Sequence, residues 1–134
     1  MIVGIGTDIV VIERISQNII RYGDCFAHKI LTEKEFLQMP KQNHRRQAEW
    51  LAAHFACKEA AVKALGTGFS EGIAPSHVEI LRDEGKAPTL TFLDKALEKA
   101  KSLGVTHCFV SYSHEKEHAI AFVTLEKSIK YSLF

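Results

Sequence analysis

The stretch HFACKEAAVKALGTG (residues 54–68) combines alanine-rich apolar sequence with three charged residues and ends in glycines. Wound as a helix of about 3.6 residues per turn, it places Lys58 on the same face as the apolar Val62. The other side carries alanines such as Ala60 and Ala64, which are small enough for another backbone or a ligand to approach. An ionised side chain in a dry core costs on the order of several kcal/mol unless it is paired. The stretch therefore predicts a largely buried helix whose charges need partners or a chemical purpose.

Two interpretations of these charges are open from the residues alone. In the first, Glu59 and Lys63 form an exposed i,i+4 ion pair worth about 0.3 to 0.5 kcal/mol, and Lys58 extends its amine to solvent. In the second, Glu59 ligates a hard cation and Lys63 contacts a phosphate. Gly66 and Gly68 would then let the chain turn beneath that phosphate, although a helix end needs only one glycine.

A second carboxylate, Asp8, follows a short strand and precedes a helix. Helix capping is the ordinary role for an aspartate in this position. The same carboxylate could join Glu59 in holding Mg²⁺, which prefers oxygen ligands and keeps waters and substrate phosphates in its coordination shell. No local pattern in the sequence joins the two residues.

The whole chain predicts an α+β fold, with helices packed on a small antiparallel sheet, in a single domain of residues 1–134. The expected elements are a strand at 2–6, a helix from Ile9 to near Gly23, a helix that begins with a Thr32–Glu35 capping box and ends at Pro40, the central helix at 46–65, a helix at 93–104, and two hairpins joining 77–83 to 89–93 and 105–113 to 119–126.

Composition is that of an ordinary globular protein, with 46% apolar and 25% charged residues and a formal net charge of +1. This charge argues against a nucleic-acid partner. Cys25, Cys57 and Cys108 follow no pattern, which predicts free thiols serving as small core residues in a reducing compartment. The first residues fit neither a signal peptide nor a membrane span, so we expect a cytoplasmic protein without a membrane partner.

His114 and His118 flank the last hairpin turn and could in principle bind zinc. No HxxxH helix or CxxC motif supports such a site. A solvated turn is the ordinary interpretation, and a phosphate contact from His114 is the functional alternative.

Four stretches resemble a known family in their order and spacing: GIGTDIVVIERI (4–15), ILTEKE (30–35), FACKEAAVKALGTG (55–68) and VSYSHEKEHAIAFV (110–123). The family is that of the holo-acyl-carrier-protein synthases, the small group of the 4'-phosphopantetheinyl transferases. The resemblance implies an enzyme of fatty acid biosynthesis with that family's α+β fold. It would transfer the 4'-phosphopantetheine arm of coenzyme A to a serine of apo acyl carrier protein and release adenosine 3',5'-bisphosphate. It also implies a homotrimer whose active sites lie between subunits.

The resemblance also assigns residues. Asp8 and Glu59 would bind Mg²⁺, and Lys63, near the pyrophosphate, would complete the catalytic set. Arg14 and Arg21 would meet the carrier protein. The residues implied for coenzyme A, including two arginines that are plausible phosphate contacts, are Arg45, Arg46, His54, Lys63, Gly66, Gly68, Gly85, Lys86, Pro88 and His114.

Two positions depart from the family pattern. Many members have arginine where this chain has His54, which predicts a weaker or more pH-dependent recognition of the 3'-phosphate of coenzyme A. The family's Gly-Lys-Pro turn carries an inserted Ala87 here, which would alter the adenine-side contacts of Gly85, Lys86 and Pro88.

Two other functions fit part of the pattern. A non-catalytic assembly module would have no reason to keep Asp8, Glu59 and Lys63 together. A Mg²⁺-dependent phosphohydrolase acting on a nucleotide would use the same three residues, but it would not need a basic first helix. The products of the reaction distinguish the three functions.

Overall fold

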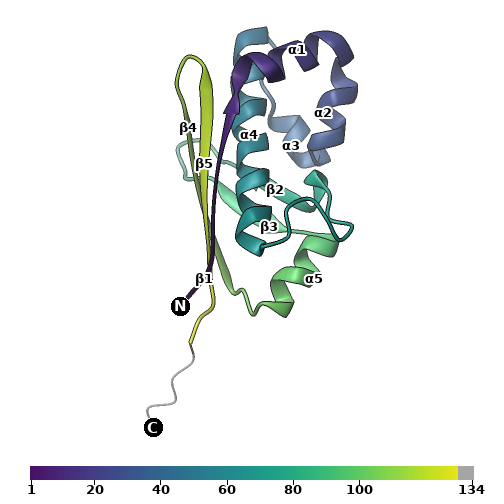
Figure 1. The fold of residues 1–134 in the computed structure, drawn as a ribbon. Coiled ribbons are helices and arrows are strands. Elements are labelled where there is room, and N and C mark those ends of the chain that lie inside the picture. Colours follow the sequence, from purple (N-terminus) through teal and green to yellow (C-terminus); the bar gives the residue numbers. More distant parts are fainter. Residues whose placement is uncertain (130–134) are drawn as a thin grey trace.

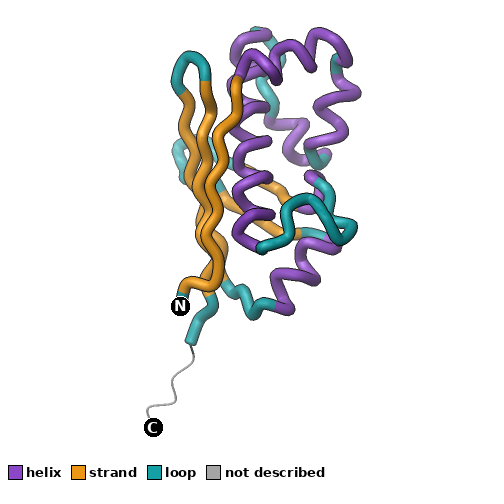
Figure 2. Tube along the Cα trace, viewed as in Figure 1, coloured by secondary structure: helices purple, strands orange, loops and turns teal. Residues whose placement is uncertain are grey.

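The computed structural model describes residues 1–129. Its elements are β1 (Ile2–Val11), α1 (Ile12–Tyr22), α2 (Asp24–Ile30), α3 (Glu33–Gln38), α4 (His44–Leu65), a 3₁₀ turn η1 (Pro75–His77), β2 (Val78–Leu81), β3 (Thr89–Phe92), α5 (Asp94–Ser102), β4 (His107–His114) and β5 (His118–Glu126). They form two antiparallel sheets, one with the strand order β1-β5-β4 and one with β2 beside β3. The long helix α4 packs against one face of the larger sheet (Figures 1 and 2). This arrangement confirms the predicted α+β fold.

Strand β1 is longer than predicted, and this changes the role of Asp8. The strand pairs with β5 as far as Val11, and Asp8 lies opposite Ala121. The helix expected from Ile9 begins only at Ile12, after Val11, whose side chain makes no capping hydrogen bond. Asp8 is therefore a strand residue, and its predicted alternative role as a helix cap is wrong.

Helix α4 is the centre of the fold, as its sequence predicts. Asn43 caps its first turn by accepting a hydrogen bond from the Arg46 amide, so the helix begins at His44. It ends at Leu65, because Gly66 adopts the left-handed conformation that closes many helices. Its apolar face is buried, and Leu51 and Val62 are fully inaccessible to solvent.

The alanine-rich side of α4 is in close contact with β1. A Cβ atom added to Gly6 would overlap the carbonyl oxygen of Ala60, and one added to Gly4 would overlap that of Ala64. The strand backbone therefore lies directly on the helix backbone, as the alanines on this side of the helix predict, and the two glycines of the strand permit the same approach. This contact brings Asp8, two residues after Gly6, beside the C-terminal half of α4.

The predicted capping box and hairpins are confirmed. Thr32 accepts a hydrogen bond from the Glu35 amide, and the Glu35 carboxylate accepts one from the Thr32 amide, which starts α3. Strands β2 and β3 form one hairpin, and β4 and β5 form the other. Helix α2 was not predicted, because its seven residues are too short for a clear periodic pattern.

Lys58 is fully buried rather than extended to solvent, so the predicted exposure of its amine is wrong. Its Nζ atom lies 2.7 Å from the Oε1 atom of Glu35, whose side chain is also fully buried. The amine also donates to the carbonyl oxygens of Pro75, at 3.0 Å, and Val78. The second Glu35 oxygen accepts from the Ile80 amide at 2.8 Å. Burial lowers the pKa of Lys58, while the Glu35 carboxylate acts in the opposite direction. The ion pair thus joins α3 to α4, and its hydrogen bonds to the backbone of Val78 and Ile80 join both helices to β2.

The sheet face turned away from α4 is apolar and exposed. Side chains alternate along each strand, and the large apolar side chains that point outward from β1, β5 and β4 are about half exposed. They include Ile5, Ile9, Phe109, Ile120 and Phe122. Ile9 lies directly opposite Ile120 in the β1–β5 register. These five residues are called the outer apolar face below.

All three cysteines are free, but they do not share one environment. Cys57 is buried, and burial raises the pKa of its thiol to about 12. Cys108 is half-buried, whereas Cys25 is exposed on α2. The prediction that all three serve as core residues is therefore wrong for Cys25. Within residues 1–129, no helix is both long and apolar enough to cross a membrane.

Candidate active site

Asp8, Glu59 and Lys63 meet at the β1 edge of the large sheet. The Nζ atom of Lys63 lies 2.8 Å from the Oδ1 atom of Asp8 and donates to the carbonyl oxygen of Thr7 at 3.1 Å. Asp8 is brought here by the glycine contact between β1 and α4, and Lys63 by the last turn of α4. A hollow of about 320 Å³ is lined by Asp8 and Lys63 together with Ile9 and other residues.

The charges of this cluster influence one another. Burial and the nearby Asp8 charge raise the pKa of Glu59, while Lys63 and Arg14 act in the opposite direction. The hydrogen bond to Asp8 raises the pKa of Lys63. Lys63 therefore stays protonated at neutral pH, and its ion pair is with Asp8 rather than with its helical neighbour Glu59. The first of the two interpretations, an i,i+4 ion pair of Glu59 with Lys63, is therefore wrong, because Lys63 is paired with Asp8 instead.

The donor set suits a hard divalent cation that takes few protein ligands. After burial, the nearby Asp8 carboxylate is the second cause that raises the pKa of Glu59. A cation between the two carboxylates would relieve this repulsion. Among residues 1–129, no group of three or more His, Cys, Asp or Glu side chains is placed to hold a metal. Mg²⁺ needs no such group, because waters and substrate phosphates complete its shell. The zinc site considered at His114 and His118 has no support in this part of the chain.

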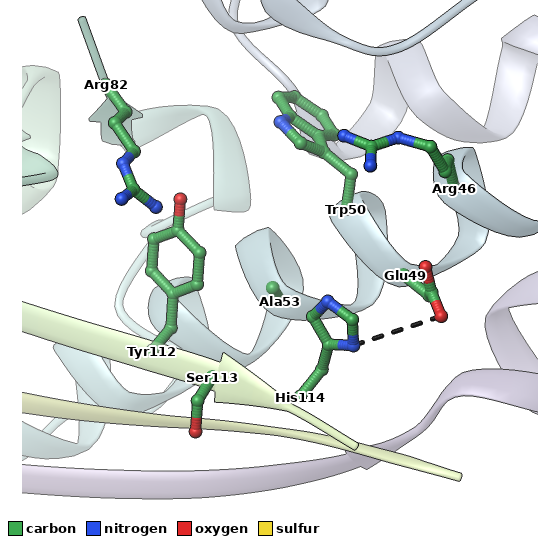
Figure 3. Close-up of a pocket in the computed structure, with 8 residues that line it drawn as sticks. All are labelled: Arg46, Glu49, Trp50, Ala53, Arg82, Tyr112, Ser113 and His114. Atoms are coloured by element: carbon green, nitrogen blue, oxygen red, sulfur yellow. Dashed lines mark ion pairs between the residues drawn. The ribbon is translucent and has the colours of Figure 1, made fainter. Parts of the chain in front are cut away.

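A second site lies between the first half of α4, the end of β4 and the start of the β2–β3 loop. It is a pocket of about 400 Å³ with aromatic and basic walls (Figure 3). The residues that line it are Arg46, Glu49, Trp50, Ala53, Arg82, Tyr112, Ser113 and His114. Two arginines and a histidine against one carboxylate make this pocket suitable for an anion.

Of the residues predicted to contact coenzyme A, Arg46 and His114 line this pocket, but Arg45 does not. The guanidinium of Arg45 donates to the carbonyl oxygen of Lys116 and to Glu49, the latter at 3.2 Å. Arg45 thus ties the N-terminal end of α4 to the β4–β5 turn. His114 lies 3.9 Å from the same Glu49 carboxylate (Figure 3).

His54 lies beneath the pocket and not on its surface. Its side chain is 1% exposed, its ring stacks on Trp50 with centroids 3.7 Å apart, and its Nδ1 atom is 2.9 Å from the Trp50 carbonyl oxygen. Burial lowers its pKa from 6.5 to about 4, so the ring is neutral at physiological pH. The expectation that His54 makes a pH-dependent phosphate contact is therefore wrong, because a neutral, buried ring supports the pocket wall instead. The alternative expectation, weaker recognition of the 3'-phosphate, stays a prediction.

The remaining predicted residues lie outside this pocket. Gly66 and Gly68 form the turn after α4, where both have positive φ angles. Gly85, Lys86 and Pro88 belong to the loop between β2 and β3. Arg21 is exposed in the last turn of α1, and Arg14, on the same helix, is exposed but close enough to influence Glu59.

Sequence reasoning missed six of the residues that line the pocket: Glu49, Trp50, Ala53, Arg82, Tyr112 and Ser113. Trp50 could have been noticed, because it is the one tryptophan in the chain and lies four residues before His54 on the same helix. Arg82 and Tyr112 carry no local signal, since their elements meet α4 only in the folded chain.

In one copy of the chain the two sites lie far apart. Asp8 pairs across the sheet with Ala121, which pairs on its other side with Tyr112, so the two sites lie at opposite edges of β1-β5-β4. Along α4 the rise from Trp50 to Lys63 is roughly 20 Å at about 1.5 Å per residue. The carboxylate cluster and the basic pocket therefore do not form one compact cleft.

The comparisons with known proteins show the family of the chain. A model of the 4'-phosphopantetheinyl transferase superfamily matches residues 4–123, and the chain belongs to this superfamily. The holo-[acyl-carrier-protein] synthase of Maridesulfovibrio salexigens is 49% identical over 127 residues, which cover 95% of this chain and 100% of that protein.

Two solved structures have the same fold over nearly their whole length. The holo-[acyl-carrier-protein] synthase of Neisseria meningitidis superimposes with a TM-score of 0.82 at 36% identity, covering 95% of this chain and 100% of that one. The Helicobacter pylori synthase, solved in complex with coenzyme A, superimposes with a TM-score of 0.78 at 30% identity, covering 91% and 99%. These similarities confirm the predicted family and fold.

Proposed function

We propose that this chain is a holo-[acyl-carrier-protein] synthase, acting as one phosphopantetheinyl transferase domain. It transfers the 4'-phosphopantetheine arm of coenzyme A to a serine of apo acyl carrier protein and releases adenosine 3',5'-bisphosphate. The observation that carries the proposal is the meeting of Asp8, Glu59 and Lys63 at one edge of the sheet, in a chain that belongs to this superfamily.

The reaction displaces a phosphate ester, so the protein contributes positioning and charge neutralisation. The serine hydroxyl oxygen of the carrier protein attacks the phosphorus next to the pantetheine arm, and its proton is released to solvent. The bond from that phosphorus to the bridging oxygen of the diphosphate breaks, and its electron pair leaves with that oxygen on adenosine 3',5'-bisphosphate. Lys63, protonated beside Asp8, stabilises the negative charge that develops on the departing bisphosphate. Asp8 and Glu59 would hold Mg²⁺, which supplies further neutralisation of the diphosphate when it is bound. The nucleophile belongs to the partner, so the chain needs no Ser-His-Asp set of its own.

The carrier protein would dock beside this edge on α1. Arg14 and Arg21 are both exposed there, and Arg14 lies near Glu59. Carrier proteins of this kind are strongly acidic by the family resemblance, and a basic face would steer and orient such a partner. Arg14 would then hold the carrier close to the attacked phosphorus, and Arg21 would extend the contact along the helix.

The active form is a homotrimer in this proposal, and the outer apolar face supports it. An exposed apolar surface of this kind is typical of a protein–protein contact. The hollow that contains Asp8 and Lys63 is also lined by Ile9 and Ile120 of that face. A second copy docked on the outer apolar face would therefore border the carboxylate cluster. Such docking could bring the basic pocket of one copy toward the carboxylates of another, completing a site between subunits.

The test is the intact mass of an apo acyl carrier protein after incubation with this protein, coenzyme A and Mg²⁺. We expect a gain of one phosphopantetheine arm that disappears when a chelator is added. Cleavage of coenzyme A without transfer would support a phosphohydrolase instead, and no change in either substrate would support an assembly module. Glu59→Gln should abolish transfer with little change in the unfolding midpoint, since the side chain is half-buried and serves the cation. Normal turnover by that variant would remove Glu59 from the mechanism.

A further inference from the structure

We propose that Arg82 is the specificity-determining residue that recognises the phosphomonoester on the nucleotide of coenzyme A. This inference rests on the proposed function and assigns a role within it to a residue of the β2–β3 loop. Arg82 follows β2 directly and lines the basic pocket. Arg82 binds this phosphomonoester, whereas Lys63, at the other edge of the sheet, contacts the diphosphate.

Arg82 is held in place before any ligand arrives. Its Nε atom donates to the carbonyl oxygen of Lys86 at 2.9 Å, within the same loop. Its guanidinium carbon lies 6.0 Å from the centre of the Tyr112 ring, a cation–π contact. Figure 3 shows the guanidinium end directed from the rim toward the Tyr112 hydroxyl and the pocket. Because the backbone contact uses Nε, the two Nη groups remain on the side turned to the pocket. A planar guanidinium with two adjacent donors matches the oxygens of a phosphate.

Three other basic residues near the pocket are less suited than Arg82 and Arg46 to bind a phosphate. Arg45 is engaged by Lys116 and Glu49. His54 is buried and neutral beneath Trp50. His114 faces the Glu49 carboxylate, which offsets part of its attraction for an anion.

Of the two arginines that remain, Arg82 is the anchored one, and so it loses less side-chain freedom when it binds. Arg46 is exposed on the first turns of α4, and in Figure 3 its guanidinium lies beside the Trp50 ring. Trp50 and Tyr112 provide flat apolar walls that suit a purine base next to the phosphate. Under the proposed function, the group that enters this pocket is the adenosine 3',5'-bisphosphate part of coenzyme A.

Trp50 is an intrinsic fluorescent probe of this pocket, because it is the single tryptophan of the chain and lines the site. Trp50 fluorescence should be titrated with adenosine 3',5'-bisphosphate and with adenosine 5'-monophosphate. In Arg82→Gln we expect affinity for the bisphosphate to fall about 10- to 100-fold, the range for loss of a charge-assisted hydrogen bond. Affinity for the monophosphate should change little. Lys101→Gln, an exposed charge removed from α5, should bind both nucleotides as the unmodified chain does.

A second readout separates this inference from the proposed function. In the transfer assay, Arg82→Gln should raise the KM for coenzyme A, leave kcat unchanged, and lose the preference for coenzyme A over its 3'-dephospho form. Arg82→Lys should restore only part of that preference, because an amine cannot make the paired contact. Equal bisphosphate affinity in the Arg82→Gln and unmodified chains would overturn the inference even if transfer is observed. Absence of transfer by the unmodified chain would instead overturn the proposed function, whatever the titration shows.

Discussion

The buried His54 makes the folded protein sensitive to acid, and the size of the effect follows from its pKa. The pKa falls from 6.5 to about 4 because burial disfavours the charged ring. One pKa unit corresponds to about 1.36 kcal/mol, so protonating this ring in the folded state costs about 3 kcal/mol more than in the unfolded chain. Between these two pKa values the unfolded state binds more protons than the folded state. His54 therefore lowers the free energy of unfolding as the pH falls from about 6.5 to about 4, and its contribution is constant below that range.

The perturbation is His54→Gln, which keeps a donor near the Trp50 carbonyl oxygen and cannot titrate. The assay is urea unfolding followed by circular dichroism at a series of pH values from 7.5 to 4. We expect the unmodified chain to lose about 3 kcal/mol more than His54→Gln across this interval. The matched control is His28→Gln, which removes an exposed histidine on α2 and should keep the pH dependence of the unmodified chain. Parallel curves for His54→Gln and the unmodified chain would refute the reasoning, because they would show that His54 takes up no proton on unfolding.

Three further substitutions test the frame around the site. Lys58→Met leaves the buried Glu35 carboxylate without its cation, so the free energy of unfolding in urea should fall by about 3 to 5 kcal/mol; a loss below about 1 kcal/mol would mean that the pair contributes little. Gly6→Ala should force β1 away from the Ala60 carbonyl oxygen, so both the unfolding midpoint and transfer activity should drop, whereas unchanged activity would show that the close backbone contact is dispensable. Ile120→Asp places a charge in the outer apolar face, and light scattering should then report a monomer with greatly reduced activity; a trimer of normal activity would place the contact elsewhere.

Local sequence signals predicted the helices and hairpins whose causes are local. The capping box at Thr32 and Glu35 and the glycine at 66 each determine a helix end within a few residues. The extent of β1 could not be predicted in this way. Residues Thr7 to Val11 are extended because they pair with β5, more than a hundred positions later in the chain. The helical spacing of the isoleucines therefore gave a misleading start for the first helix.

The same distinction applies to the site. The charges in the central helix and the carboxylate after the first strand drew attention to Asp8, Glu59 and Lys63, and the resemblance to a family assigned their roles. The structure brings Asp8 and Lys63 into contact with Glu59 beside them. The partner of Lys58 could not be inferred, because Glu35 lies 23 positions earlier on another helix. Many members of the family have arginine at the position of His54, and this comparison suggested that His54 contacts coenzyme A. Its burial depends on the stacking with Trp50 and on the strand that carries Tyr112, and neither is visible in the local sequence.

The backbone contact between β1 and α4 affects which substitutions this protein can tolerate in evolution. Most helix–strand spacings are set by side-chain volume, so they shift when core residues are replaced. Here the spacing at Gly6 and Gly4 is set by main-chain atoms that every sequence shares. Substitutions elsewhere in the core can accumulate without altering the separation of Asp8 from Lys63. The relative positions of Asp8 and Lys63 are thereby protected from the effect of substitutions in the core. A substitution of Gly4 or Gly6 would remove that protection.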